Sequence, residues 1–80
     1  MNIKVKDLRP GEEAEIVAFE GKDLAYRSKL LSMGITKEAS IKLIKIAPLG
    51  DPVEIEVRGF NLSLRKQEAD ILQIRRKNNG

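Results

Sequence analysis

Apolar and polar side chains alternate along several short segments of the chain, most regularly between residues 53 and 57. There, Val53, Ile55 and Val57 are separated by two glutamates. Successive side chains of a β-strand point to opposite faces of the sheet, so this pattern predicts a strand with one buried and one solvent-facing side. The preceding residues 47–52 include two prolines and a Gly-Asp pair, which predict a rigid turn before the strand.

Four other segments predict further short strands. Residues 13–19 carry apolar side chains on both faces and predict a strand that is partly buried on each side. Residues 40–47 change their apolar register halfway, which predicts a β-bulge or a strong bend. Residues 60–64 alternate again, and residues 71–75 predict the last strand.

Residues 22–33 change to the period of an α-helix. Two adjacent rows follow at helical spacing: Leu24, Ser28, Leu31 and Ile35 form one row, and Tyr26, Leu30 and Met33 form the other. A short helix buries one broad stripe, so we expect the first row to face the core and the second row to be partly exposed, although Leu30 also fits the core. Gly34 predicts the end of the helix, because glycine readily adopts the left-handed conformation of a C-terminal cap. Residues 67–70 predict one more helical turn.

The predicted order is one strand, one helix and then four short strands separated by turns that contain glycine or proline. This order favours an all-β fold with one or two short helices, and within that class an SH3-like five-stranded small barrel. A five-stranded OB-fold is the nearest alternative, but its helix usually lies between the third and fourth strands. The 80 residues contain no repeat or linker, so we expect a single domain over residues 1–80.

The net charge of +3 comes from 15 basic and 12 acidic residues whose signs are interspersed, as on an ordinary soluble surface. A nucleic-acid-binding protein usually concentrates its basic residues. The basic cluster at residues 75–77 lies near the end of the chain, and we interpret residues 75–80 as a frayed tail. We therefore expect no nucleic-acid partner. No apolar run could span a bilayer and residues 1–4 do not begin a signal peptide, so we expect a cytoplasmic protein without direct membrane insertion.

The chain contains neither cysteine nor histidine, which removes disulfides, thiolate ligands and the usual general base. No serine is paired with a marked base, and no Gly-rich phosphate loop is present, so we do not expect an enzyme. Asp51, Glu54 and Glu56 could offer oxygen ligands, as could Glu12 and Glu13. Charges that deter aggregation at an exposed sheet edge explain these carboxylates more simply. We expect no metal site and no cofactor on this chain.

Several motifs of the chain resemble those of the FeoA family, which are small cytoplasmic SH3-like proteins of bacterial ferrous iron uptake. The resemblance covers nearly the whole chain and rests on five segments in order: 8–12 (LRPGE), 27–35 (RSKLLSMGI), 47–52 (APLGDP), 57–59 (VRG) and 62–69 (LSLRKQEA). Each segment alone also has a turn or core explanation, so it is their order and spacing that make the match specific. The chain departs from the family at residues 36–39, where the family often has a Pro-Gly turn. This departure concerns the type of turn and not the fold.

The resemblance implies that the protein binds the cytoplasmic part of FeoB, the membrane ferrous iron transporter with a GTPase domain. It would modulate that partner without catalytic residues of its own. The alternative is a metal-responsive regulatory SH3-like module that binds a peptide or a regulator, because a related domain forms the C-terminal part of DtxR-type repressors. Self-association also stays open.

Candidate partner contacts lie on the predicted helix and on the turns. Tyr26 and Met33 belong to residue types that are enriched at interfaces. A leucine held out on the Pro-bracketed turn would lose little entropy on docking, although Leu49 could instead fold back over the barrel mouth. Two arginines offer polar contacts. The six candidates are Tyr26, Leu30, Met33, Leu49, Arg58 and Arg65.

Overall fold

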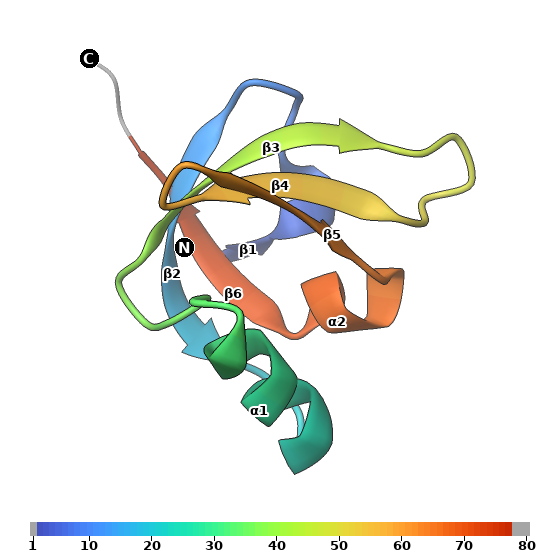
Figure 1. The fold of residues 1–80 in the computed structure, drawn as a ribbon. Coiled ribbons are helices and arrows are strands. Elements are labelled where there is room, and N and C mark those ends of the chain that lie inside the picture. The colour runs from blue at the N-terminus through green and yellow to red at the C-terminus, as the bar shows by residue number, and fades with distance from the viewer. Residues whose placement is uncertain (1, 78–80) are drawn as a thin grey trace.

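Antiparallel strand pairing organises the protein in the computed structural model, which describes residues 2–77 (Figure 1). Six strands form one sheet in the order β1-β6-β2-β3-β4-β5, and the sheet curves around a single hydrophobic core. The elements follow the chain as β1 (Ile3–Lys4), a 3-10 helix η1 (Val5–Asp7), β2 (Glu13–Phe19), α1 (Leu24–Ser32), β3 (Ser40–Ile46), β4 (Val53–Val57), β5 (Phe60–Leu64), α2 (Lys66–Asp70) and β6 (Leu72–Arg76).

All five predicted strands form, and the predicted class, an all-β SH3-like fold with short helices, is confirmed. The structure adds a sixth strand, β1, in which Ile3 pairs with Ile74 and Lys4 pairs with Gln73 of β6. A strand of two residues is too short to show an alternating pattern. For that reason the sequence pattern did not indicate it.

Residues 75–77, the described part of the tail predicted over residues 75–80, are bonded to the sheet. Arg75 and Arg76 belong to β6, which pairs with β2. Arg75 Nη2 lies 2.8 Å from Glu15 Oε1, and Arg76 Nε lies 3.0 Å from Glu12 Oε2. Strand pairing and these two ion pairs hold the arginines that the charge pattern assigned to a frayed tail. The last three residues of the predicted tail lie outside the described part of the chain.

Two shifts of strand register accompany the curvature of the sheet. The pairing of β3 with β4 shifts between Leu43 and Lys45, which confirms the bulge predicted within residues 40–47. The pairing of β2 with β6 shifts between Ile16 and Ala18. A bulge adds an unpaired residue on one strand and increases the local twist, so it helps short strands to curve around a core.

The core is aliphatic and receives side chains from nearly every element. β4 contributes as predicted, with Val53, Ile55 and Val57 buried between half-buried glutamates. Each such side chain contributes about 1.5–3 kcal/mol to folding when it is fully buried. The other buried apolar residues are Val5, Leu8, Ala14, Ile16, Leu30, Ile35, Ile41, Leu43, Leu64, Ala69, Leu72 and Ile74.

The last turn of α1 attaches the helix to the barrel. Gly34 adopts φ +86°, as predicted for a cap, and its N–H donates to Leu31 O at 3.1 Å. The Ile35 N–H donates to Leu30 O at 3.0 Å. These two bonds form a Schellman motif, which typically brings together the apolar residues on either side of the cap. Leu30 and Ile35 are accordingly both fully buried.

The face of α1 that packs against the barrel differs from the predicted one. Leu30 is fully buried, whereas Leu24 is 71% exposed and Leu31 is 43% exposed. The prediction that the row of Leu24 and Leu31 faces the core is therefore wrong, and only Ile35 of the apolar residues in that row is buried. The cap geometry at the end of α1 decides which leucine is buried, because a helix of this length docks through a single turn.

An ion pair between a buried glutamate and a partly exposed lysine joins the two α-helices. The Glu68 side chain is 2% exposed, and its Oε2 lies 2.6 Å from Lys29 Nζ on α1. Its other oxygen, Oε1, accepts the Arg65 N–H at 2.8 Å at the start of α2. Desolvation raises the pKa of Glu68, but the Lys29 ammonium and the Arg65 N–H together outweigh it, so the pKa is lowered overall. The charged form of Glu68 therefore contributes to the stability of the fold.

We expect Leu30→Ala to lower the free energy of unfolding by about 2–5 kcal/mol, because it removes a fully buried side chain at the turn that attaches α1. The matched control is Leu31→Ala on the neighbouring, partly exposed position, which should cost about 1 kcal/mol or less. Urea unfolding of the two variants measures the difference. Equal losses would mean that Leu30 does not anchor the helix.

Replacing Glu68 with Gln should lower the free energy of unfolding by about 1–2 kcal/mol at neutral pH, because it removes the charge that binds Lys29. A carboxyl whose pKa is lowered in the folded protein stabilises the fold above its ordinary value of 4.5, and this contribution is lost as the pH falls below that value. The difference between wild type and Glu68→Gln should therefore shrink on acidification. Urea titrations at pH 7, 5 and about 3 test this, and a constant difference would contradict it.

Candidate partner-binding surface

The β4–β5 turn holds an arginine in an unusual backbone conformation. Val57 pairs with Phe60, and the two residues between them, Arg58 and Gly59, have φ +53° and +83°. Two positive φ values are typical of a type I′ hairpin, whose first position favours Asn, Asp or Gly. For arginine this conformation costs on the order of 1 kcal/mol. The turn itself therefore does not explain why arginine occupies this position.

The Arg58 side chain extends from the turn to the segment that follows α1. Its Nε donates to Gly34 O at 3.4 Å, and its Nη2 donates to Thr36 Oγ1 at 3.3 Å. Both bonds are long and exposed, so they contribute little to stability. They nevertheless place the guanidinium beside the end of α1, near Met33, which is half-buried against the core.

A shallow hollow lies beside Arg58 on the outer side of β2, β3 and β4. Its volume is about 120 Å³. Pockets for small organic ligands usually measure about 300–1,000 Å³, so this hollow is too small to enclose one. The residues that line it are Glu13, Ser40, Ile41, Lys42, Glu56, Arg58 and Gly59.

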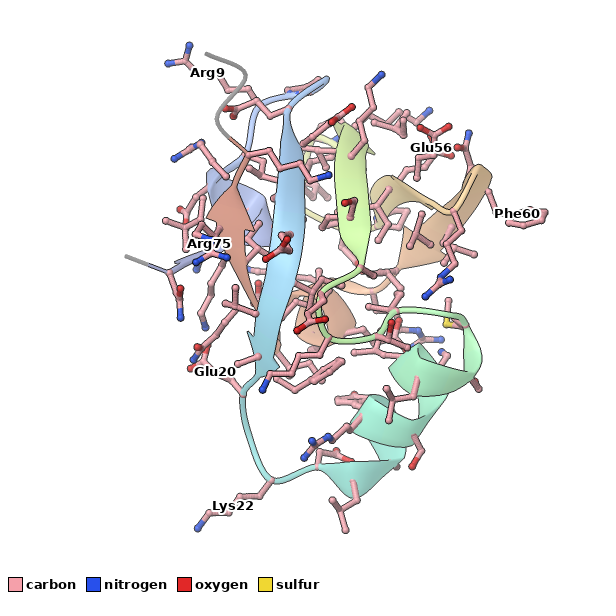
Figure 2. The ribbon with its side chains drawn as sticks, turned by 90° about the vertical axis from the view of Figure 1, so that its left-hand side faces the viewer. Arg9, Glu20, Lys22, Glu56, Phe60 and Arg75 are labelled. Carbon is pink, nitrogen blue, oxygen red and sulfur yellow. The ribbon has the colours of Figure 1, made fainter. Side chains whose placement is uncertain are left out.

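Phe60 is an exposed aromatic residue, although its alternation with Leu62 and Leu64 predicts a core position. It begins β5 and is 71% exposed. Figure 2 shows its ring projecting away from the sheet. Leu62 and Leu64 do pack toward the core. Phe60 lies on the edge strand beside the turn and is exposed, although Val57, its partner on β4, is buried in the core.

The loop between β3 and β4 holds Leu49 away from the barrel. The Gly50 N–H donates to Ala47 O at 2.7 Å, and the Ala47 N–H donates to Pro52 O at 3.1 Å. Asp51 Oδ1 accepts the N–H of Lys66 at 2.8 Å and so links the loop to the start of α2. Leu49 is 94% exposed. Of the two alternatives for this leucine, the structure shows the one in which it points out from the loop.

The six candidate residues do not form one continuous surface. Leu30 is buried in the core and is therefore not available to a partner. Arg58 precedes β5 and Arg65 follows it, and five residues of strand separate them by about 17 Å. Leu49 belongs to the Arg65 end of this hairpin, because its loop is bonded to the residue after Arg65. The candidates thus fall into two groups, one at each end of the β4–β5 hairpin.

Of the helix candidates, Met33 lies at the Arg58 end, because it precedes Gly34, to which Arg58 is bonded, and three further exposed residues were not among the six candidates. Tyr26 is half-buried on α1, and its N–H donates to Asp23 Oδ1 at 3.2 Å in the helix cap. Phe60 could have been suspected, since it directly follows a two-residue turn at the start of a strand. No feature of the sequence distinguished Leu24 and Leu31 from leucines of the core. The three missed residues are Leu24, Leu31 and Phe60.

The described residues contain no arrangement that suggests metal chemistry. Within residues 2–77, no three His, Cys, Asp or Glu side chains gather closely enough to hold a metal ion. Glu54 and Glu56 lie on the outer face of β4, opposite Ser63 and Asn61 of β5. None of the helices described is long and apolar enough to cross a membrane.

The chain matches one protein family over nearly its whole length. The sequence profile of the FeoA domain matches residues 3–76. A relative from Porphyromonas gingivalis (strain ATCC BAA-308 / W83), an Fe(2+) transport protein A/Fe(2+) transporter FeoB fusion protein, is 32% identical over 72 residues. This match covers 90% of the chain and 8% of the relative, so the chain spans a small part of that relative's length.

Solved structures share the fold. The crystal structure of an iron uptake regulatory protein (FeoA) is 30% identical, with a TM-score of 0.84 over 96% of this chain and 100% of that chain. A FeoA from Stenotrophomonas maltophilia complexed with zinc, described as an SH3 domain protein, is 18% identical, with a TM-score of 0.78 over 91% of this chain and 89% of that chain. A manganese-dependent transcriptional repressor is 10% identical, with a TM-score of 0.88 over 95% of this chain and 41% of that chain.

Similarities at 18% and 10% identity concern the fold alone. The family profile adds specific sequence information over the strands, both helices and the two turns described above. Together with the two relatives of 30% and 32% identity, it shows that this protein belongs to the FeoA family.

Proposed function

We propose that this protein is a non-enzymatic, cytoplasmic accessory factor that binds the cytoplasmic part of a FeoB-like ferrous iron transporter and modulates iron uptake. The observation that supports this most directly is the Porphyromonas gingivalis relative, in which a similar domain and the transporter form one polypeptide. Fusion keeps two parts at a high effective concentration. Such an arrangement is useful when the two parts bind each other.

Binding to a protein surface suits the features described above better than catalysis or small-molecule binding. The hollow beside Arg58 is too small for a typical ligand, and the chain lacks both histidine and cysteine. In contrast, two large apolar side chains outside the helices are mostly exposed: Leu49 on the β3–β4 loop and Phe60 beside the β4–β5 turn. Exposed apolar residues on well-fixed turns are typical anchors of protein interfaces.

Leu49 is the strongest single anchor in this proposal. Its loop is fixed by hydrogen bonds within residues 47–52 and by the bond from Lys66 to Asp51. A fixed loop loses little conformational entropy on docking, so most of the free energy from burying the leucine is available for binding. Arg58 is the second anchor, because its guanidinium is exposed and makes only long bonds to Gly34 and Thr36, which offset little of the backbone strain.

The alternative role is that of a metal-responsive regulatory module related to the C-terminal domain of DtxR-type repressors. The similarity to a manganese-dependent repressor is consistent with it, but at 10% identity this similarity concerns the fold. A pull-down from the native host, with and without iron, separates the two roles. Recovery of the transporter supports the proposal, and recovery of a DNA-binding regulator without the transporter would replace it with the alternative.

Replacing Leu49 with Asp should weaken binding to the purified cytoplasmic part of the transporter at least about tenfold, or about 1.4 kcal/mol. The reason is that a charge replaces an apolar anchor. Leu24→Asp is the matched control, since it changes an equally large exposed leucine on α1 that is not among the six candidate contacts. Isothermal titration calorimetry gives both affinities, and circular dichroism checks folding. If both variants bind like the wild type, Leu49 is not an anchor.

Arg58→Asn should stabilise the fold by about 0.5–1 kcal/mol and yet weaken transporter binding. Asparagine suits the first position of a type I′ turn, whereas the exposed bonds that Arg58 makes are weak. Thermal unfolding and calorimetric titration of the same variant measure the two effects. A stabilised variant with unchanged affinity and unchanged iron-dependent growth would show that Arg58 is not a partner contact.

A further inference from the structure

β5 leaves one side of its backbone open along its whole length. It lies at one end of the sheet and pairs with β4 alone. Within residues 2–77, no backbone hydrogen bond joins residues 60–64 to any segment other than β4. Figure 1 shows β5 running from the β4–β5 turn to α2, with β4 along one side.

The free backbone groups belong to Asn61 and Ser63. In a two-residue hairpin, the pair that flanks the turn exchanges both backbone hydrogen bonds, and such pairs alternate along the ladder. Val57 and Phe60 flank this turn, so Phe60, Leu62 and Leu64 direct their N–H and C=O groups to β4. Asn61 and Ser63 direct theirs outward, and both residues are exposed.

The opposite edge of the sheet is protected, but β5 is not. β1 at that edge contains only two residues, and its Lys4 forms an ion pair with Glu20 at 3.2 Å. Natural edge strands avoid unwanted pairing by being short, by bulges, by proline or by lysine. β5 contains no lysine or proline, and its pairing with β4 has no register shift. The outer edge of β5 is therefore available to pair with another strand.

The charges around β5 indicate what kind of strand would pair with it. Arg58 lies just before the strand, and Arg65 and Lys66 lie just after it, with no acidic residue from 57 to 67. On the outer face of the neighbouring β4, however, two glutamates lie opposite Asn61 and Ser63. A complementary strand therefore carries acidic residues at its two ends and uncharged residues between them.

The same charges disfavour a second copy of this chain as the partner. Antiparallel pairing of two β5 strands about Leu62 would set Arg58 of one copy opposite Lys66 of the other. Like charges placed directly opposite one another destabilise a strand pair. Phe60 and Leu62, by contrast, offer apolar contact to alternate residues of an incoming strand from another protein.

We infer that the outer edge of β5 is a docking site for an extended segment of the partner protein, which adds a seventh strand to the sheet. The segment has about five uncharged residues with alternate apolar side chains, flanked on both sides by Asp or Glu. Main-chain bonds to Asn61 and Ser63 hold it, and the end charges meet Arg58 on one side and Arg65 with Lys66 on the other. This inference rests on the proposed function for the partner's identity, but the mode of binding is tested independently of the transporter.

The test uses a synthetic peptide, Asp-Val-Thr-Val-Thr-Val-Asp with blocked ends, and the isotope-labelled full chain. We expect the peptide to slow hydrogen exchange of the Asn61 and Ser63 amides about tenfold or more, since these amides become bonded. Amides on β1, at the other edge, should not change. No binding, or protection elsewhere on the protein, overturns the inference.

Two matched peptides separate strand addition from simple charge attraction. One has the same seven residues with both aspartates moved inward, so its net charge is unchanged. The other keeps the sequence but carries N-methyl groups on the backbone nitrogens that would face β5. Both should bind at least about tenfold more weakly. Equal binding of all three peptides would overturn the inference.

A protein variant links the edge to the transporter. Ser63→Pro removes one outward donor and should weaken transporter binding, whereas Ser63→Ala should not. Should the proline variant fail to fold, Ser63→Lys, which places a protective charge on the edge, takes its place. Binding that survives in the folded variant overturns the edge site and leaves the proposed function intact. If the wild type binds the peptide at this edge but does not bind the transporter, the proposed partner is wrong and the edge site stands.

Protection of Asn61 and Ser63 that increases with protein concentration in the absence of peptide would show that a second copy occupies the edge. That result overturns the assignment to another protein. Analytical ultracentrifugation over the same concentrations reports the accompanying change in mass.

Discussion

The burial of one face of β4 is the constraint on which the arrangement of the other elements depends. Its three inward side chains, Val53, Ile55 and Val57, lie in the core, and the strand pairs along its length with both β3 and β5. A slip of one residue would turn these side chains to the solvent. The loop with Leu49 and the turn with Arg58 begin and end this strand. Burial of β4 therefore determines where both of these exposed residues lie.

Five of the six strands were predictable from the sequence, and the clearest of them follows one rule. Where one face of a strand is buried, apolar residues repeat every second position, and β4 shows this repeat without interruption. The register change within residues 40–47 was also visible, and it became the shift between Leu43 and Lys45. Even the end of α1 could be read from Gly34, since few other residues adopt its conformation readily.

The features that escaped prediction depend on contacts between segments far apart in the chain. Leu30 and Leu31 have the same chemistry, and a cap formed after the helix decides which of them is buried. Arg75 and Arg76 look like a basic tail until β2 brings Glu15 and Glu12 beside them. The sequence pattern likewise does not show how the six candidate contacts are arranged relative to one another. The strand predicted over residues 60–64 already separates Arg58 from Arg65, but the bond from Lys66 to Asp51, which places the Leu49 loop at the Arg65 end, could not be seen in the sequence pattern.

The exclusively aliphatic core has a practical consequence for studying the molecule. The chain has no tryptophan and a single tyrosine, and that tyrosine, Tyr26, lies half-buried on α1 rather than inside the barrel. Intrinsic fluorescence therefore reports on the surroundings of one helix, while the barrel contributes almost no emission. A change in tyrosine emission during a titration would follow α1, and the methyl groups of the core would have to be followed by nuclear magnetic resonance. Comparing the two signals would show whether α1 and the barrel respond together or separately.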